Sequence, residues 1–434
     1  MSTADIHRTI DAVWRMESAK IIAVLARMLR DVGQAEELAQ DALVRALERW
    51  PQDGVPDRPA AWLTTVAKRS AIDALRRRQM QDRKHEEIGR DLEAVEAMAP
   101  PAEQPLELIE LEDGTADIGD DLLRLVFIAC HPVLAPEARI ALTLRLLGGL
   151  STTEIARAFL VPEATVAQRI VRAKRTLAEA RVPFEMPRED ELGVRLSSVL
   201  QVIYLVFNEG YAATAGDDWM RPALCDEALR LGRILAELVP LEAEVHGLVA
   251  LMEIQSSRTR ARIDERGTPV LLLEQNRARW DPLLIRRGLA ALDRAAALRP
   301  AQGFGPYALQ AAIAACHARA RTADETDWPG MAALYDALAQ IAPSPVVELN
   351  RAVAVAMAFG PAAGLELVDA LQGEPLLRGY HLLPSVRGDF LFKLGRLPEA
   401  QAEFEAAAAL TRNLRERELL LARAADCAQD QPRG

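Results

Sequence analysis

The chain has few of the residues that mark disulfide-rich and membrane proteins. Its four cysteines, at positions 130, 225, 316 and 427, lie far apart without a Cys-x-x-Cys pair, which argues against a disulfide framework or a zinc knuckle. No apolar run reaches the ~18 residues of a membrane span, and the N-terminus has no apolar stretch of signal-peptide type. We therefore expect a cytoplasmic protein that holds neither a metal nor another cofactor.

Glycine and proline are also sparse, with 24 and 25 in 434 residues, and aromatic residues make up 5%. Half of the residues are hydrophobic, so most of the chain is expected to be neither disordered nor fibrous. Alternating Val, Ile and Thr runs are scarce, whereas Ala, Leu, Arg and Glu dominate and apolar residues recur at helical spacing. The sequence predicts an all-α protein, and its length suggests two to four domains.

The net charge of −11 is unevenly distributed along the chain. Residues 81–121 hold 14 acidic and three basic side chains, whereas residues 1–80 and 122–188 are mildly basic. The acidic segment also contains three prolines and three glycines, a composition that predicts a flexible linker. Because charge segregated along a chain says more about partners than its total does, the negative sum does not exclude nucleic acid.

Residues 150–177 have the pattern of a helix-turn-helix. Ser151 and Glu154 have the spacing of a capping box at the start of a short helix. Pro162 interrupts that helix, and a second one opens with Glu163 in its first turn. The apolar stripe of the second helix consists of Val166, Ile170, Ala173 and Leu177. Its opposite face is polar and suits a DNA major groove, while a solvated helix of a structural bundle is the alternative.

The polar face offers two kinds of candidate DNA contact. Glutamine can bond adenine, and arginine can bond guanine, through two hydrogen bonds each. The candidate base readers on this face are Thr165, Gln168, Arg169 and Arg172. Lys174 and Arg175 lie further along and are better placed for phosphates, which set the register without specificity.

The N-terminal block carries a second signal. Residues 34–49 predict an amphipathic helix with Leu38 and Leu47 on its apolar side. A further helix over 61–78 begins near Trp62, which could support a base from a separated strand, although a core tryptophan is the interpretation we favour. This helix ends in three consecutive arginines, Arg76, Arg77 and Arg78, which form a patch of the phosphate-binding kind. The alternative is that these arginines complement the dipole at the C-terminus of the helix.

The two blocks and their order resemble the extracytoplasmic-function branch of the sigma-70 family of bacterial transcription initiation factors. Residues 8–80 resemble region 2, in which the segment matching 35–41 binds core RNA polymerase and the helix matching 62–78 melts and reads the −10 element. Residues 122–180 resemble region 4, whose second helix reads the −35 element. The resemblance depends on the strings Leu-Ser-x-x-Glu-Ile-Ala and Thr-Val-x-x-Arg-Ile-x-Arg-Ala-Lys together.

The resemblance implies roles for individual residues. The expected polymerase contacts are Glu37, Leu38, Gln40 and Asp41. The expected contacts with the −10 region are Trp62, Lys68, Arg69, Arg76, Arg77 and Arg78. The expected contacts with the −35 region are Thr165, Gln168, Arg169, Arg172, Lys174 and Arg175. The implied partners are core RNA polymerase and promoter DNA, both double-stranded and melted, with no membrane. The chain itself would not be an enzyme, because nucleotide addition belongs to the polymerase.

Two departures from the family pattern concern promoter choice. Arg69 stands where region 2 usually has Asn, and Leu160 stands where the helix-turn-helix turn usually has Gly. The resemblance therefore implies no particular promoter sequence. The acidic linker is expected to tether the two DNA-binding modules, and its charge could imitate a nucleic-acid backbone in a basic channel of the polymerase.

From about residue 190 onward the sequence predicts successive helices. A tetratricopeptide-like pair is indicated by small and large residues at Gly388, Leu391, Gly395, Ala400, Phe404 and Ala407. Gly360 precedes Gly395 by 35 residues, near the 34-residue period of such repeats. We expect a solenoid that serves as a regulatory or protein-docking module. A tetratricopeptide-like extension of this kind also resembles one subgroup of the branch. An irregular helical bundle is the alternative.

Three further motifs could suggest chemistry. Glu209 could act as a base in the segment 208–211, but we favour a helix end in which Gly210 is a left-handed cap flanked by packing aromatics. The pairs Cys130-His131 and Cys316-His317 are adjacent residues, which make a poor tetrahedral metal site, so we expect core thiols.

The sequence thus predicts region 2 at 1–80, a linker at 81–121, region 4 at 122–186 and a tetratricopeptide-like extension at 187–434. The predicted function is that of a sigma factor that directs transcription initiation at specific promoters. One alternative is an interaction scaffold with a degenerate sigma-like N-terminal half. Another is an enzyme with a site around 204–219.

Overall fold

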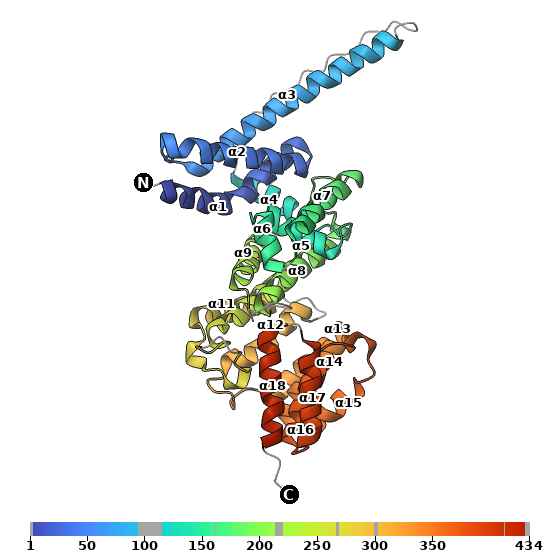
Figure 1. Cartoon of the computed structure of the whole chain (residues 1–434). Coiled ribbons are helices and arrows are strands. Elements are labelled where there is room, and N and C mark those ends of the chain that lie inside the picture. Colours follow the sequence, from blue (N-terminus) through green and yellow to red (C-terminus); the bar gives the residue numbers. More distant parts are fainter. Residues whose placement is uncertain are drawn as a thin grey trace. The chain divides into compact units, whose positions relative to one another are not determined.

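The computed structural model describes residues 3–93, 115–159, 161–212, 220–265, 269–298, 303–411 and 413–429 (Figure 1). Within these ranges the regular secondary structure is helical, apart from one isolated bridge between Ile263 and Pro269. The all-α prediction is confirmed. No helix in the described ranges is long and apolar enough to span a membrane.

The chain divides into two compact units. The N-terminal unit comprises residues 1–157 and 161–202, and the C-terminal unit comprises residues 158–160 and 203–434. The helices of the N-terminal unit are α1 (Thr3–Leu29), α2 (Val32–Asp53), α3 (Pro59–Glu93), α4 (Thr115–Ala129), α5 (Pro136–Leu146), α6 (Thr152–Phe159), α7 (Glu163–Glu179) and the first part of α8 (Glu189–Tyr211).

The C-terminal unit continues with ten α-helices in the described ranges. They are α9 (Pro222–Leu238), α10 (Ala243–Ser257), α11 (Pro282–Ala297), α12 (Pro306–Arg319), α13 (Trp328–Ile341), α14 (Pro345–Phe359), α15 (Pro361–Ala370), α16 (Leu382–Lys393), α17 (Leu397–Leu410) and α18 (Leu414–Gln429). Short 3-10 turns occupy Thr259–Ala261, Leu272–Glu274, Arg277–Arg279 and Pro375–Leu377.

Local sequence accounts for several of the helix ends. Asp31 caps α2 by accepting a hydrogen bond from the backbone N–H of Gln34 at 3.0 Å. The predicted capping box of α6 is confirmed, because Ser151 Oγ accepts from the Glu154 N–H at 3.1 Å and the Glu154 carboxylate accepts from the Ser151 N–H at 2.8 Å. Pro162 precedes α7 as predicted.

The helix predicted over 61–78 is longer than expected. Helix α3 continues to Glu93, so the three arginines lie inside the helix and do not complement a C-terminal dipole, which corrects that interpretation. Helix α4 begins at Thr115, so both ends of the expected linker are helical. The middle of the expected linker, residues 94–114, lies outside the described residues.

The first part of α8 packs with the helices before it. Ser198 donates a hydrogen bond to the carbonyl of Cys130 at 2.6 Å and accepts one from Arg139 at 2.5 Å. Arg195 donates to the carbonyl of Phe127 at 2.9 Å. The units accordingly divide within α8, beyond the boundary expected at residue 187.

Gly210 does not have the role that the sequence suggested. It lies within α8 and is absent from the glycines with positive φ, so it is not a left-handed cap. A Cβ at this position would lie 2.7 Å from the backbone nitrogen of Cys225 at the start of α9. Glycine is therefore required for close approach of two helices, and Glu209 pairs with Arg221.

The helix pair predicted near the C-terminus exists. A Cβ on Gly388 of α16 would lie 3.0 Å from the Phe404 ring of α17, and Gly395 forms the turn between the helices with φ 74°. The cluster around them buries Leu391, Ala400 and Ala407. Small residues thus allow the close packing that their spacing predicted.

Candidate nucleic-acid interface

Helix α2 buries mainly alanines and leaves all of its carboxylates except that of Glu36 exposed. Its buried residues are Ala35, Glu36, Ala39, Ala42, Ala46 and Trp50. The expected apolar face was partly wrong, since Leu38 is half-buried and Leu47 is 38% exposed. Among the expected polymerase contacts, Glu37 and Asp41 are exposed, whereas Gln40 is half-buried and donates a hydrogen bond to Glu36. An acidic, partly apolar surface along α2 is therefore open to a partner protein.

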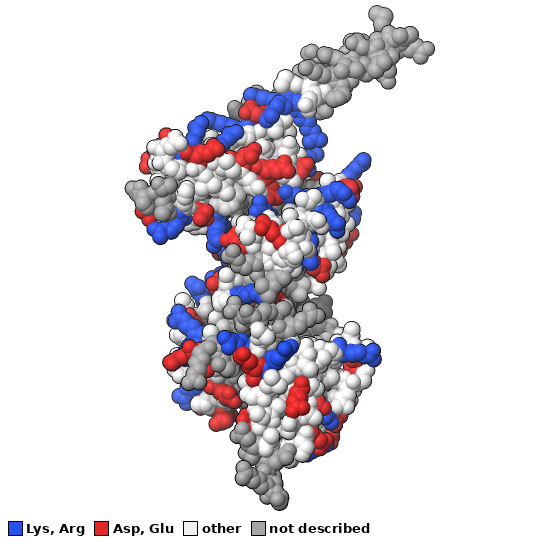
Figure 2. All heavy atoms as spheres, in the orientation of Figure 1, with Lys and Arg blue, Asp and Glu red and all other residues white. Residues whose placement is uncertain are grey.

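Helix α3 presents the expected basic side chains. Arg69 and the consecutive arginines 76–78 are exposed, and Lys68 is half-buried. Figure 2 shows Lys and Arg gathered along the described part of α3. Trp62 is half-buried, with its ring 5.4 Å from that of Trp50 in an edge-to-face contact. This packing agrees with the core tryptophan that we favoured, although Trp62 is not fully buried.

Helices α6 and α7 form the predicted helix-turn-helix. All four residues of the apolar stripe are buried, with exposed fractions of 6% or less, at Val166, Ile170, Ala173 and Leu177. Thr153 on α6 donates a hydrogen bond to Glu163 on α7 at 2.9 Å and so links the two helices. Leu160 in the turn lies outside the described residues.

The polar face of α7 differs in exposure from one expected DNA contact to the next. Gln168, Arg172 and Arg175 are exposed, while Thr165 and Arg169 are half-buried. Arg175 has a solvent-exposed ion pair with Glu179 at 3.2 Å, which is weak and easily exchanged for a phosphate. The exposed side chains of Gln168, Arg172 and Arg175 are accessible, and their contacts with DNA stay a prediction.

Lys174 points elsewhere. Its ammonium pairs with Glu36 of α2, whose side chain is 4% exposed, and Arg145 of α5 pairs with the same carboxylate at 2.6 Å. In this arrangement Lys174 is therefore paired with a carboxylate, and its expected phosphate contact stays a prediction. Sequence analysis missed Glu36 and Arg145, because their partners lie more than a hundred positions away in the chain and helical periodicity reports only local neighbours.

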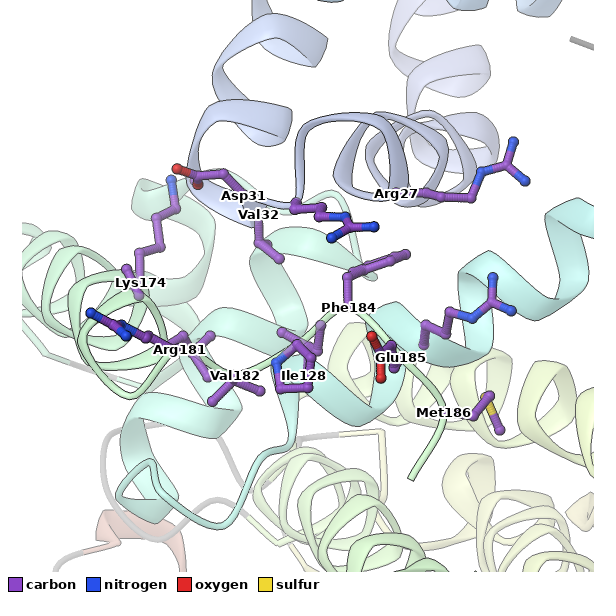
Figure 3. A pocket seen from close by; sticks show the side chains of 16 residues that line it. Arg27, Asp31, Val32, Ile128, Lys174, Arg181, Val182, Phe184, Glu185 and Met186 are labelled. Carbon is purple, nitrogen blue, oxygen red and sulfur yellow. The ribbon is translucent and has the colours of Figure 1, made fainter. Parts of the chain in front are cut away.

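Further contacts join the same two groups of helices. Arg15 of α1 pairs with Glu154 of α6 at 2.7 Å, and Arg27 of α1 pairs with the fully buried Asp121 of α4 at 3.2 Å. A cavity of about 680 Å³ lies between α1, α2, α4 and α7. Figure 3 shows Lys174 reaching across it to the start of α2, beside Asp31 and Val32. The basic and helix-turn-helix modules thus lie directly against each other.

The cysteine–histidine pairs have no ligand geometry in the described residues, where no three His, Cys, Asp or Glu side chains come together as a metal site would require. Cys130 is buried and forms a hydrogen bond with Thr143 at 3.3 Å. Burial raises the pKa of its thiol to about 11, which makes it unreactive at neutral pH. Cys130 is therefore a core thiol, as the sequence predicted.

Comparison with protein families agrees with this geometry. Residues 14–80 match sigma-70 region 2, and residues 124–177 match sigma-70 region 4. Residues 195–296 match DUF6596, a family of unknown function. The first match contains the exposed arginines of α3, and the second contains the helix-turn-helix.

Individual relatives fall into two kinds. An uncharacterized protein of Rhizobium meliloti (strain 1021) is 46% identical over 396 residues, which are 91% of this chain and 90% of that protein. A probable ECF RNA polymerase sigma factor, SigI of Mycobacterium tuberculosis, is 27% identical over 186 residues, or 41% of this chain and 57% of SigI. The ECF RNA polymerase sigma factor SigK of Mycobacterium ulcerans is 28% identical over 162 residues, or 36% of this chain and 78% of SigK.

Sigma factors are not enzymes, because they bind a polymerase that performs the chemistry. The family matches cover the basic helix α3 and the helix-turn-helix in the expected order. The chain belongs to the extracytoplasmic-function branch of the sigma-70 family and carries a C-terminal extension that includes a DUF6596 region.

Proposed function

We propose that this sigma factor binds core RNA polymerase in the cytoplasm and directs it to a specific set of promoters. The observation that carries the proposal is the exposed polar face of α7, with Gln168 and Arg172, on a helix-turn-helix whose apolar stripe is buried. Glutamine and arginine can each form two hydrogen bonds with a base edge, so an exposed face that carries both suits a major groove.

The two DNA contacts would differ in kind. The arginines 76–78 on α3 carry three charges on consecutive residues and suit the phosphates at the upstream edge of melted DNA. Gln168, Arg169 and Arg172 on α7 suit base edges of the −35 element. The exposed carboxylates of Glu37 and Asp41 suit a basic surface of the polymerase.

Promoter spacing requires the two modules to separate. The −10 and −35 elements are about 25 base pairs apart, or about 85 Å at ~3.4 Å per base pair. In the structure, Glu36 of one module contacts Lys174 of the other. We infer that this docked arrangement belongs to the factor without polymerase and that α7 leaves α2 when the complex assembles. The acidic linker between them would act as the tether.

The C-terminal unit would serve as a tetratricopeptide-like regulatory or docking module. Gly360 and Gly395, 35 residues apart, have φ values of 102° and 74° in the turns between α14 and α15 and between α16 and α17. Helix-joining turns with a positive-φ glycine at this interval support a repeated helix pair. Stacked pairs of this kind usually present a concave binding surface.

Transcription in vitro with purified core polymerase tests the proposal. The full chain should give promoter-dependent transcripts, and replacing Arg76, Arg77 and Arg78 by Ala should reduce open-complex formation and transcript yield about tenfold or more. The matched control is the pair Arg286→Ala and Arg287→Ala, which removes exposed arginines from α11 of the C-terminal unit.

The outcomes separate the candidate functions. A chain that binds no core polymerase and gives no transcripts from any genomic promoter fragment would be a scaffold with a degenerate sigma-like half. A triple variant that initiates as well as the parent would remove the arginines from the proposed DNA contacts while leaving the factor's activity intact.

A further inference from the structure

The C-terminal unit encloses a cavity that the proposed sigma function does not use. The cavity has a volume of about 330 Å³ and lies among α8, α10, α12, α13 and α14. This volume is at the lower end of the ~300–1,000 Å³ found for small-molecule sites. Three of its lining residues, Tyr204, Asn208 and Tyr211, belong to the segment that stood out in the sequence.

Arg258 gives the cavity its charge. It is only 9% exposed, and its hydrogen-bond partners in the described residues are the neutral side chains of Tyr211 and Gln255. One terminal nitrogen of its guanidinium donates hydrogen bonds to the Tyr211 hydroxyl at 2.6 Å and to the side-chain oxygen of Gln255, but its Nε has no hydrogen-bond partner in the described residues. A buried donor without a partner is costly unless something else satisfies it.

Another arginine of the same unit differs from Arg258 in having a carboxylate partner. Arg233 on α9 pairs with the buried carboxylate of Glu253 on α10 at 2.7 Å. Arg258 follows Glu253 by five residues, yet neither aspartate nor glutamate is among the residues that line its cavity. The chain therefore supplies a carboxylate to Arg233, whose side chain is 40% exposed, and none from the cavity lining to the more deeply buried Arg258.

The surroundings of Arg258 are electropositive. Arg258 and Arg277, after burial itself, lower the pKa of His317 to about 3, so this lining residue is neutral near pH 7. Its Nδ1 also lacks a hydrogen-bond partner among the described residues. The site thus combines a fixed positive charge with a neutral ring nitrogen, which favours an anion with a hydrogen-bonding group.

The walls are aromatic and aliphatic. Tyr204 packs edge-to-face on Tyr307, and Phe207 stacks on Tyr211 with ring centroids 5.7 Å apart. Leu251, Ile313, Ala314 and Leu338 complete the apolar lining. Tyr204 donates a hydrogen bond to Gln310 at 2.9 Å, so its ring has a fixed orientation. Such walls suit a flat apolar body.

We propose that this cavity binds a small carboxylate with an aromatic body, whose carboxylate group is held by Arg258. An arginine fork matches a carboxylate through two parallel hydrogen bonds. The cavity is large enough for a single ring with a short acidic side chain and too small for a folded segment. The C-terminal unit would then be a ligand-binding module, a role that goes beyond promoter recognition and does not depend on it.

Ligand-observed NMR and calorimetry on the full chain test the proposal, with phenylacetate as the probe and phenylacetamide as its uncharged counterpart. We expect phenylacetate to bind with saturable heat and the amide to bind at least about tenfold more weakly. Arg258→Gln should lower the affinity for phenylacetate at least about tenfold. The matched control, Arg260→Gln, removes the same charge from an exposed position two residues away and should leave binding unchanged.

A second variant guards against misfolding of Arg258→Gln, because Arg258 also contacts Tyr211 and Trp280. Asn350 lines the cavity and is exposed, so Asn350→Trp would obstruct the entrance without touching Arg258. It should abolish phenylacetate binding while thermal unfolding stays like that of the parent. Equal binding of acid and amide, no binding of phenylacetate at millimolar concentration, or full binding by Asn350→Trp would overturn the proposal, whatever the outcome of the transcription assay.

Discussion

The carboxylate of Glu36 on α2 accepts a hydrogen bond from Nε of Arg145 on α5 at 2.6 Å. Glu36 is 3% exposed and also pairs with Lys174 on α7, so one buried carboxylate links the expected polymerase-binding helix to two helices of the DNA-reading module. A single residue therefore connects two surfaces that the proposed initiation complex requires to be apart.

Replacing Glu36 by Gln should destabilise the N-terminal unit. The change leaves the guanidinium of Arg145 and the ammonium of Lys174 without their shared counter-ion, and both side chains are only 21% exposed. Breaking a buried ion pair costs about 3–5 kcal/mol, and we expect about 2–4 kcal/mol here because both cations can turn toward water. Urea unfolding followed by circular dichroism measures the loss.

Glu37→Gln is the control for that experiment. Glu37 is the exposed neighbour of Glu36, so its stability effect should stay within about 0.5 kcal/mol. If Glu36→Gln were as stable as this control, the two modules would not be held together by the Glu36 pairs, and the inferred docked state would lose its main support.

Replacing Gln168 by Ala should relax the choice of base at one position of the −35 element. A bidentate contact with a base edge contributes about 1–3 kcal/mol of discrimination. Competition binding of the polymerase holoenzyme to promoters that differ at each −35 position measures this directly. Gln168 is not a reader if the variant retains the parent's preference at every position.

Replacing Arg175 by Ala should have a different effect on the same assay. Its exposed guanidinium lies further along α7 and is expected to contact phosphate. Affinity should fall similarly for every promoter, and the slope of log affinity against log salt should decrease by about one. A base-dependent loss would instead place Arg175 among the readers.

Local patterns in the sequence were sufficient to predict the helix-turn-helix. The spacing of Ser151 and Glu154 gave the capping box, and the i, i+4 spacing of Val166 and Ile170 gave the buried stripe. These features depend on residues within two helical turns of each other. For the same reason, the exposed positions of Gln168 and Arg172 followed from the face opposite the stripe.

Features that depend on distant partners could not be predicted in this way. Lys174 was expected at a phosphate, but its position on α7 faces Glu36, which lies far away in the sequence. Gly210 had the spacing of a helix cap, and only the position of Cys225 on the next helix shows why glycine is required. In both cases tertiary packing decides a role for which helical periodicity contains no information.

Replacing Gly364 by Ala should destabilise the C-terminal unit. A Cβ there would clash with the Cβ of Ala356 and lie 2.9 Å from the carbonyl oxygen of Ala352, so α14 and α15 would have to move apart. Overpacking costs about 1–3 kcal/mol, which exceeds the ~1 kcal/mol that alanine gains over glycine within a helix. Gly373→Ala, which meets no atom within 4 Å, should change stability by less than about 0.5 kcal/mol. Thermal unfolding of both variants decides the comparison, and equal melting temperatures would contradict this account of the helix contact.

Acidification should destabilise the C-terminal unit through His317. Burial first, and then the charges of Arg258 and Arg277, lower its pKa from 6.5 to about 3. Between these values the unfolded chain binds a proton that the folded chain does not, so the stability contribution is complete above pH 6.5 and is lost as the pH falls toward 3. At pH 5 the loss relative to neutral pH is about 2 kcal/mol, from ~1.4 kcal/mol for each pH unit below 6.5. His317→Gln should flatten this dependence in urea unfolding monitored by tryptophan fluorescence, whereas replacing the exposed His7 by Gln should leave it as steep as in the parent. A parent protein with equal stability at pH 5 and pH 7 would contradict the lowered pKa of His317 in the folded state.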